Sequence, residues 1–165
     1  MRTTLTTLLA TLLLWSSGLG QRTPDDIAGL VVVVHADNPK TDLSSGELLA
    51  YFKMERKWWP KPNKKRATLV LRGTRSDETR ALLETVYKMS AKELRKYWLG
   101  KVFRGEIPRR PAVVAKTKDV LARIARDTGA FSIVRAEEVA KGVRQLTIDG
   151  KRPGDEGYLL DVKSR

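Results

Sequence analysis

The sequence predicts a three-layer αβα domain built on a mixed, mostly parallel sheet. One observation is the run "GLVVVVHADN", a continuous β-branched stretch typical of a strand covered on both faces. Another is the segment "LVLRGTRSDETRALLETVY", Leu69–Tyr87, which reads as strand, loop and helix. Segments typical of strands and segments typical of helices continue to alternate along the rest of the chain. Strands separated by helices favour a sheet with helices on both faces.

The elements of the first two thirds follow from caps and apolar spacing. Ser44 or Ser45 can cap a helix that ends near Phe52, and a second strand is predicted over residues 67–71. One helix begins after Ser76, and another covers residues 91–103. The apolar residues that these helices turn to one side, which we assign to the core, are Leu82, Leu83, Val86, Tyr87, Leu94, Tyr97, Trp98 and Val102.

The last third is predicted to continue the alternation. A short strand at residues 112–115 precedes a helix with Val120, Leu121, Ile124 and Ala125 inward, and Gly129 separates this helix from a strand through Val134. Next come a short helix at 137–141 and a strand at 143–148. After a turn at Asp149-Gly150, "GYLLDV" is predicted to form a last edge strand.

Residues 1–20 have the layout of a secretory signal peptide. Arg2 precedes an apolar run that is too short to span a membrane, and small residues follow. We expect cleavage near Gln21, a polar lead over 21–28 and a single domain over 29–165. The mature protein would be exported, periplasmic or otherwise outside the cytoplasm, and soluble. A retained amphipathic anchor is the alternative, although no polar face runs along the segment.

Composition restricts the partners. The formal net charge is +13, and loss of Arg2 with the signal lowers it to +12. For a basic exported chain we expect phosphate-like anions, anionic lipid or acidic protein surfaces as partners, and no nucleic acid. There is no cysteine and one histidine, so the usual zinc and iron–sulfur ligands are missing, and we expect no metal and no cofactor. We assign His35 to the end of a strand.

Motifs for catalysis are also missing from the sequence. It contains no glycine-rich phosphate loop ending in Gly-Lys-Ser/Thr and no serine elbow. The adjacent acids Asp77 and Glu78, like Glu137 and Glu138, would point about 100° apart on a helix, so neither pair is a good acid/base dyad. Complementing a helix dipole explains both pairs more simply. We therefore expect that the protein is not an enzyme.

The loop between Leu71 and the helix after Ser76 resembles an oxyanion site in its residue types. Arg72, Arg75 and Ser76 lie together there. A helix N-terminus offers free N–H groups, and arginines add further donors. Asp77 and Glu78, however, follow where an anion would be placed.

Four segments stand out in order along the chain: "VVVVHADNPKTDLSSGELLAYF", "LRGTRSDETRALLETVY", "YWLGKVFRGEIPRRP" and "DTGAFSIV". As an ordered set they resemble the phosphate-binding protein of the bacterial phosphate ABC transporter, a type 2 periplasmic binding protein, and especially its small stand-alone relatives. The similarity runs through nearly all of residues 29–150. It implies a domain equivalent to a single lobe of the two-lobed binding protein.

The resemblance also implies a position for the ligand. In the family, this lobe contributes an Arg, three residues, and then Ser-Gly-Thr at a helix start. Arg72 and Ser76 match that pattern, Asp77 and Glu78 replace the Gly and Thr, and Thr79 follows one place late. Because carboxylates at neutral pH only accept hydrogen bonds, the implied site for phosphate or a related oxyanion is weakened. The candidate anion-binding residues are Arg72, Arg75, Ser76 and Thr79. The alternative is that Ser76 only caps the helix.

A second candidate surface is the loop "KMERKWWPKPNKKR", which holds seven basic residues and one acid. Basic residues interleaved with aromatic ones can follow a phosphate backbone or lie at a membrane interface. By the resemblance, one of Trp58 and Trp59 packs beneath the loop and the other is free to be exposed. The basic-surface candidates are Lys57, Lys61, Lys64, Lys65 and Arg66, which Arg104, Arg109 and Arg110 could extend.

Two functions remain open at this point. One is an exported, non-enzymatic solute-binding domain for phosphate or a related oxyanion. The other is an envelope interaction module that kept the fold, lost the ligand, and binds an acidic protein or anionic lipid through its basic surface.

Overall fold

The computed structural model describes residues 27–62 and 64–162. The predictions for residues 1–20, for cleavage near Gln21 and for most of the polar lead lie outside these residues. Within the described part, no helix combines the length and the apolar character needed to cross a membrane. The elements in chain order are β1 (Leu30–His35), β2 (Asp42–Leu43), α1 (Ser45–Phe52), β3 (Thr68–Arg72), α2 (Asp77–Ala81), η1 (Leu82–Tyr87), α3 (Ala91–Phe103), β4 (Ala112–Val114), α4 (Thr117–Arg126), β5 (Ala130–Arg135), η2 (Ala136–Glu138) and β6 (Val143–Ile148).

The strands of the described residues form one sheet in the order β2-β6-β1-β5-β3-β4. β1 pairs antiparallel with both neighbours, so that Val32 lies opposite Ile133 of β5 and Leu146 of β6. The pairs β2–β6, β5–β3 and β3–β4 are parallel. β1 is thus the one strand of this sheet that runs against the others, which confirms the predicted mixed, mostly parallel sheet.

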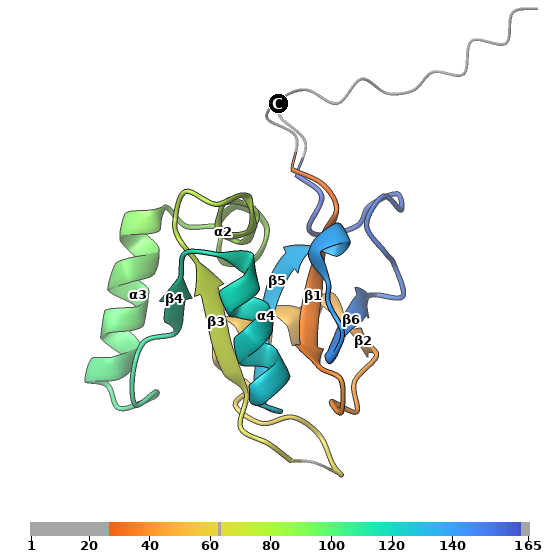
Figure 1. Cartoon of the computed structure of the whole chain (residues 1–165). Helices are drawn as coiled ribbons and strands as arrows, with labels where there is room; N and C mark the ends of the chain where they lie inside the picture. Colours follow the sequence, from red (N-terminus) through yellow and green to blue (C-terminus); the bar gives the residue numbers. More distant parts are fainter. Residues whose placement is uncertain (1–26, 63, 163–165) are drawn as a thin grey trace, which may run out of the picture.

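Helices cover both faces of the sheet, as predicted. The alternating side chains of β1 point into two apolar clusters. Val31 and Val33 pack with Val120 and Ile124 of α4 on one face, and α4 lies in front of the sheet in Figure 1. The opposite face is covered by the larger cluster, which includes side chains of α1, η1 and α3. The fold is therefore a three-layer αβα arrangement.

The serine caps predicted the helix starts. The Ser44 hydroxyl accepts the Glu47 N–H at 3.2 Å in a capping box, and Ser90 does the same for α3. The helix after Ser76 also begins where predicted, but it changes from α to π geometry at Leu82. The Thr85 hydroxyl donates to the Ala81 carbonyl at 2.8 Å, so a side chain binds the group that an α-helical N–H would use.

The edge strand predicted for "GYLLDV" is wrong. Tyr158 and Leu160 are buried in the core, and the Tyr158 hydroxyl donates to the Leu30 carbonyl at 3.0 Å. In this segment only Val162 makes a β-bridge, with Ile27. Gly157, whose φ is 71°, bends the chain just before this stretch, so its apolar residues cover the sheet instead of extending it.

Two smaller differences concern short elements. The helix predicted at 137–141 is a single 3-10 turn, η2, and β2 is a two-residue strand for which the sequence carried no signal. β2 depends on a long-range pairing with β6, so local pattern could not reveal it. His35 closes β1, as predicted, and its Nδ1 accepts the Asp37 N–H at 3.0 Å.

The two adjacent tryptophans of the Lys53–Arg66 loop have different environments. Trp59 is only 1% exposed, stacks on Tyr51 with a 4.2 Å centroid separation, and donates its indole N–H to the Gly129 carbonyl at 2.9 Å. Trp58 is 52% exposed. The expectation that one indole packs beneath the loop and the other is exposed is confirmed.

Candidate functional site

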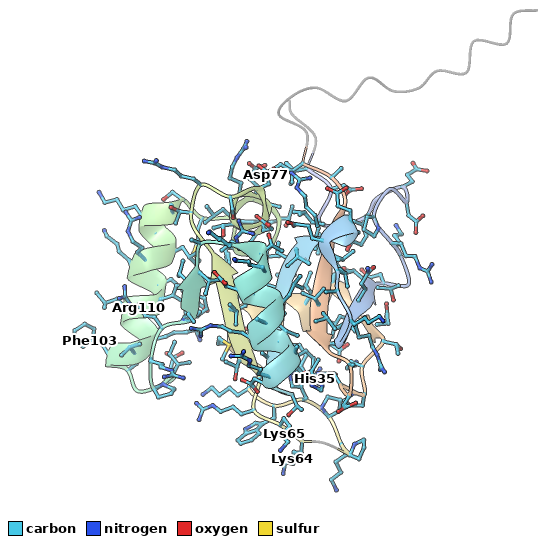
Figure 2. The ribbon with its side chains drawn as sticks, viewed as in Figure 1. His35, Lys64, Lys65, Asp77, Phe103 and Arg110 are labelled. Atoms are coloured by element: carbon cyan, nitrogen blue, oxygen red, sulfur yellow. The ribbon has the colours of Figure 1, made fainter. Side chains whose placement is uncertain are left out.

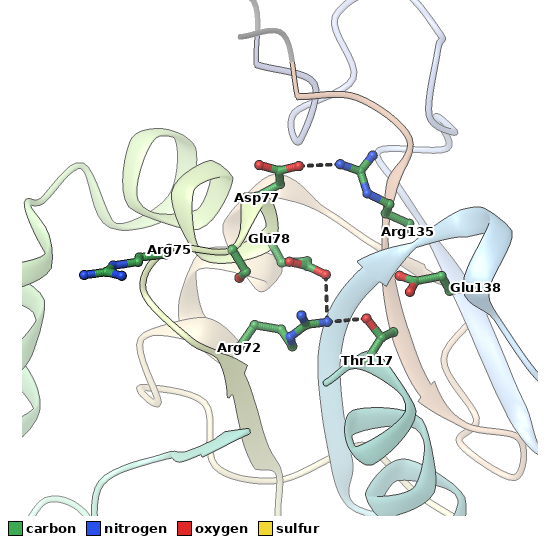
Figure 3. A pocket seen from close by; sticks show the side chains of 8 residues that line it. Arg72, Arg75, Asp77, Glu78, Thr117, Arg135 and Glu138 are labelled. Atoms are coloured by element: carbon green, nitrogen blue, oxygen red, sulfur yellow. Dashed lines mark hydrogen bonds and ion pairs between the residues drawn. The ribbon is translucent and has the colours of Figure 1, made fainter. Parts of the chain in front are cut away.

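A pocket of about 310 Å³ lies at the carboxyl ends of β3 and β5. These two strands are parallel neighbours, so their carboxyl ends meet at one edge of the sheet, where α2 and η2 begin. In sheets of this type, that edge is a common position for ligand sites. The residues that line the pocket are Arg72, Arg75, Ser76, Asp77, Glu78, Thr117, Arg135 and Glu138 (Figure 3).

Arg72 is the last residue of β3, and its guanidinium is already engaged. It donates to the Glu78 carboxylate at 3.2 Å and to the Thr117 hydroxyl. The side chains of Arg72 and Glu78 are only 15% and 7% exposed, so water screens this ion pair weakly. The Arg72 Nε is buried without a hydrogen-bond partner among the described residues. Glu78 and Thr117 therefore both engage the Nη1 group, while the Nε–H is left without a partner.

The hydroxyls of Ser76 and Thr79 form hydrogen bonds within the fold. The Ser76 hydroxyl accepts the Thr79 N–H at 3.3 Å, which is the N-cap interaction of α2. Thr79 is 2% exposed, and its hydroxyl donates to the Arg72 carbonyl at 2.9 Å, so it ties α2 to β3 beneath the pocket. Arg75 lines the rim, and its guanidinium points away from Arg72 in Figure 3.

Besides Asp77 and Glu78, three lining residues were not among the sequence candidates for the site. Arg135 forms an ion pair with Asp77. The Oδ1 of Asp77 also lies 3.4 Å from the Nη1 of Arg80. Glu138 makes no ion pair within the described residues, and its carboxylate faces the pocket in Figure 3. Thr117 binds Arg72. Arg135 follows the strand predicted through Val134, but its proximity to Arg72 depends on strand order, which local pattern does not specify.

The charges of the pocket are balanced. Three arginines line it, together with three carboxylates. The Glu78 carboxylate occupies Arg72 donors that an external oxyanion would need. The side chains that line the pocket are arginine, hydroxyl and carboxylate groups.

The predicted basic surface lies elsewhere in the molecule. Lys61, Lys64, Lys65 and Arg66 are exposed, and Lys57 is half-buried. They belong to the loop that enters β3, whereas the pocket lies where β3 ends. Figure 2 shows Lys64 and Lys65 at the end of the molecule opposite Asp77. The anion-site candidates and the basic loop are therefore separate surfaces.

Comparison with known proteins places the fold. No protein-family profile and no curated protein matches the chain. Among solved structures, it is similar to an ABC-type phosphate transport receptor from Vibrio cholerae, with a TM-score of 0.63 and 17% identity over 81% of this chain and 53% of the receptor. PstS from Borrelia burgdorferi aligns with a TM-score of 0.61 and 12% identity, over 82% of this chain and 55% of PstS.

A third similar structure is a putative phosphate ABC transporter substrate-binding protein from Clostridium perfringens, which was solved with bound phosphate. It aligns with a TM-score of 0.58 and 16% identity, over 76% of this chain and 48% of that protein. The chain thus spans about half the length of these structures. The predicted resemblance to phosphate ABC transporter substrate-binding proteins is confirmed at the level of the fold, and the coverage agrees with a small single-lobe form.

Proposed function

We propose that this protein is an exported, non-enzymatic solute-binding domain whose pocket takes phosphate or a related oxyanion with weakened affinity. The observation that carries the proposal is Arg72, whose guanidinium lies at the end of the interior strand β3, lines the pocket and pairs with a single buried carboxylate. The similar receptors, one of which holds phosphate, support a solute-binding role for this fold. The layout of residues 1–20 supports export.

In this proposal Glu78 is an internal competitor. Its carboxylate is itself an oxyanion on Arg72, so an incoming ligand must either displace it or bind beside it. A carboxylate about 4 Å from a bound anion costs about 1 to 4 kcal/mol, depending on the effective dielectric. The anion-binding set is Arg72 with Ser76, with Arg75 at the rim and Thr79 supporting the loop from below.

The test is to remove the charge of Glu78 while keeping its shape. Glu78→Gln removes the repulsion and leaves Arg72 only a neutral, weaker acceptor, so we expect phosphate to bind at least about tenfold more tightly than to the wild type. Isothermal titration calorimetry with phosphate and with sulfate measures the change. Arg72→Ala added to Glu78→Gln should abolish the gain, because the guanidinium supplies the paired charge.

Glu156→Gln is the matched control. It makes the same change in net charge at an exposed residue outside the pocket, and it should leave phosphate affinity within about twofold, because exposed charges are screened. If Glu78→Gln stays folded and binds phosphate no better than the control, the Arg72–Glu78 pair is structural and the oxyanion proposal is wrong.

A further inference from the structure

The chain topology brings two basic segments to one end of the molecule. β3 and β4 pair in parallel, so the segments that enter them lie at the same edge of the sheet. The Lys53–Arg66 loop enters β3, and residues 104–111 connect α3 to β4. Figure 2 shows Lys64 and Lys65 at the end of the molecule opposite Asp77, and Phe103 and Arg110 at one side, beside the lower part of α3. This end, at the amino ends of β3 and β4, is named the amino-end face.

The charge of the amino-end face is strongly positive. Its basic residues are Lys57, Lys61, Lys64, Lys65, Arg66, Arg104, Arg109 and Arg110. Of these, Arg104 pairs with Glu106, and the others form no ion pair within the described residues. Hydrogen bonds from Lys101 and Arg104 lower the pKa of Glu106 to about 2. Glu106 is only partly exposed, whereas Glu55 of the Lys53–Arg66 loop and Asp127, at the end of α4, are exposed acids.

Two large apolar side chains project from the same segments. Phe103, the last residue of α3, is 83% exposed, and Trp58 is 52% exposed. Leu99, one turn before Phe103, is also exposed. In the chain, Trp58 follows Lys57 and Phe103 precedes Arg104, so each ring has a basic neighbour in sequence.

We propose that the amino-end face binds the surface of an anionic lipid bilayer. Anionic headgroups attract the unpaired lysines and arginines, each contributing about fivefold to partitioning near the surface. Aromatic rings are favoured at the level of the headgroups, where Trp58 and Phe103 would insert. The proposal is independent of the pocket.

The form of the surface favours a bilayer over an acidic protein. The exposed aromatic residues belong to two separate segments, and one of these, a proline-containing loop, also carries exposed lysines. A stable protein interface needs a closely packed area of about 800 Å² on each partner. A fluid bilayer needs no fixed arrangement of charges, and lysine is a flexible point charge suited to such a surface.

Vesicle co-sedimentation tests the proposal. The protein should bind vesicles of phosphatidylcholine containing phosphatidylglycerol at low salt, and bind pure phosphatidylcholine vesicles far less. Lys64→Glu with Lys65→Glu should weaken binding by about 25-fold or more. Trp58→Ser with Phe103→Ser should weaken it by at least about tenfold and leave its salt dependence in place, since the rings carry no charge.

Two control variants test whether the loss of binding is specific to the amino-end face or follows from any loss of positive charge or exposed apolar surface. Lys118→Glu with Arg152→Glu makes the same charge change at exposed residues near the opposite end of the sheet, and Val113→Ser removes an exposed apolar side chain of β4. Both should bind vesicles within about threefold of the wild type. The proposal is overturned by absent binding to phosphatidylglycerol vesicles, by equal losses in test and control variants, or by binding of polyglutamate but not of vesicles.

Discussion

At the scale of single residues, the pair Trp58 and Trp59 shows how position decides the role of a side chain. The two residues share one loop, yet only Trp59 enters the core, where it meets Phe131 edge-on with a 5.6 Å centroid separation and stacks on Tyr51. Its indole N–H also satisfies the Gly129 carbonyl. The Lys53–Arg66 loop is thus held to the sheet by a buried aromatic contact and a hydrogen bond.

Replacing each indole by a phenyl ring compares the two positions. Trp59→Phe loses packing volume and leaves the Gly129 carbonyl without that donor, so the free energy of unfolding should fall by about 2 to 3 kcal/mol. Trp58→Phe should change it by less than about 0.5 kcal/mol. Urea unfolding followed by far-UV circular dichroism measures both. Equal losses would contradict the structural role assigned to Trp59.

The candidate site was predictable only in part at this scale. Arg72 and Ser76 could be found because the strand, the loop and the helix cap are local in sequence, and the structure places both at the pocket. The contact of Arg72 with Thr117 could not be found, since Thr117 lies 45 residues away, and local pattern did not show that Arg72 donates to nearby Glu78. Thr79, a sequence candidate, is instead buried beneath the loop.

At the scale of elements, Gly129 joins three parts of the structure. It lies between α4 and β5, its N–H binds Asp127, and its carbonyl accepts both the Thr68 N–H and the Trp59 indole N–H. A Cβ at this position would lie 2.1 Å from the Arg66 carbonyl oxygen. Close approach of the two backbones therefore requires glycine here, beyond the helix-stop role predicted from the sequence.

A pair of glycine variants tests this packing. Gly129→Ala forces the Arg66 backbone to move, and we expect a loss of about 2 kcal/mol or more in the free energy of unfolding. Gly46→Ala, in the first turn of α1 with open space around its Cβ position, should raise stability by up to about 1 kcal/mol. Thermal denaturation of both variants gives the result. A neutral Gly129→Ala would mean that the loop adapts without cost.

At the scale of the whole molecule, the sheet order places β1 between β6 and β5. Apolar clusters cover both faces of the sheet at this strand. Residues Leu30–Val34 are at most 1% exposed. β4 lies at the edge of the sheet, where Val113 is exposed. The pocket and the amino-end face lie at opposite ends of this sheet, so a ligand and a surface could be bound at the same time.

Native-state hydrogen exchange should report this arrangement. Amides of residues 31–34 pair with two neighbouring strands and should exchange only through global unfolding. Amides of β4 should exchange through local opening, and their opening free energy should be at least about 2 kcal/mol lower than that of residues 31–34. Comparable protection in both strands would show that β4 opens only when the whole sheet does.

The sequence by itself determined the fold class, most strand and helix positions and the helix caps. These features depend on local periodicity, on caps within one turn and on residue chemistry. Only the tertiary structure decided that the last apolar segment covers the sheet, that Glu78 occupies Arg72, and that Arg135 and Glu138 complete the pocket. It also decided that two basic segments share one end. The physical reason is that local pattern specifies neither strand order, which joins residues far apart in the chain, nor the partner that a side chain such as Arg72 selects.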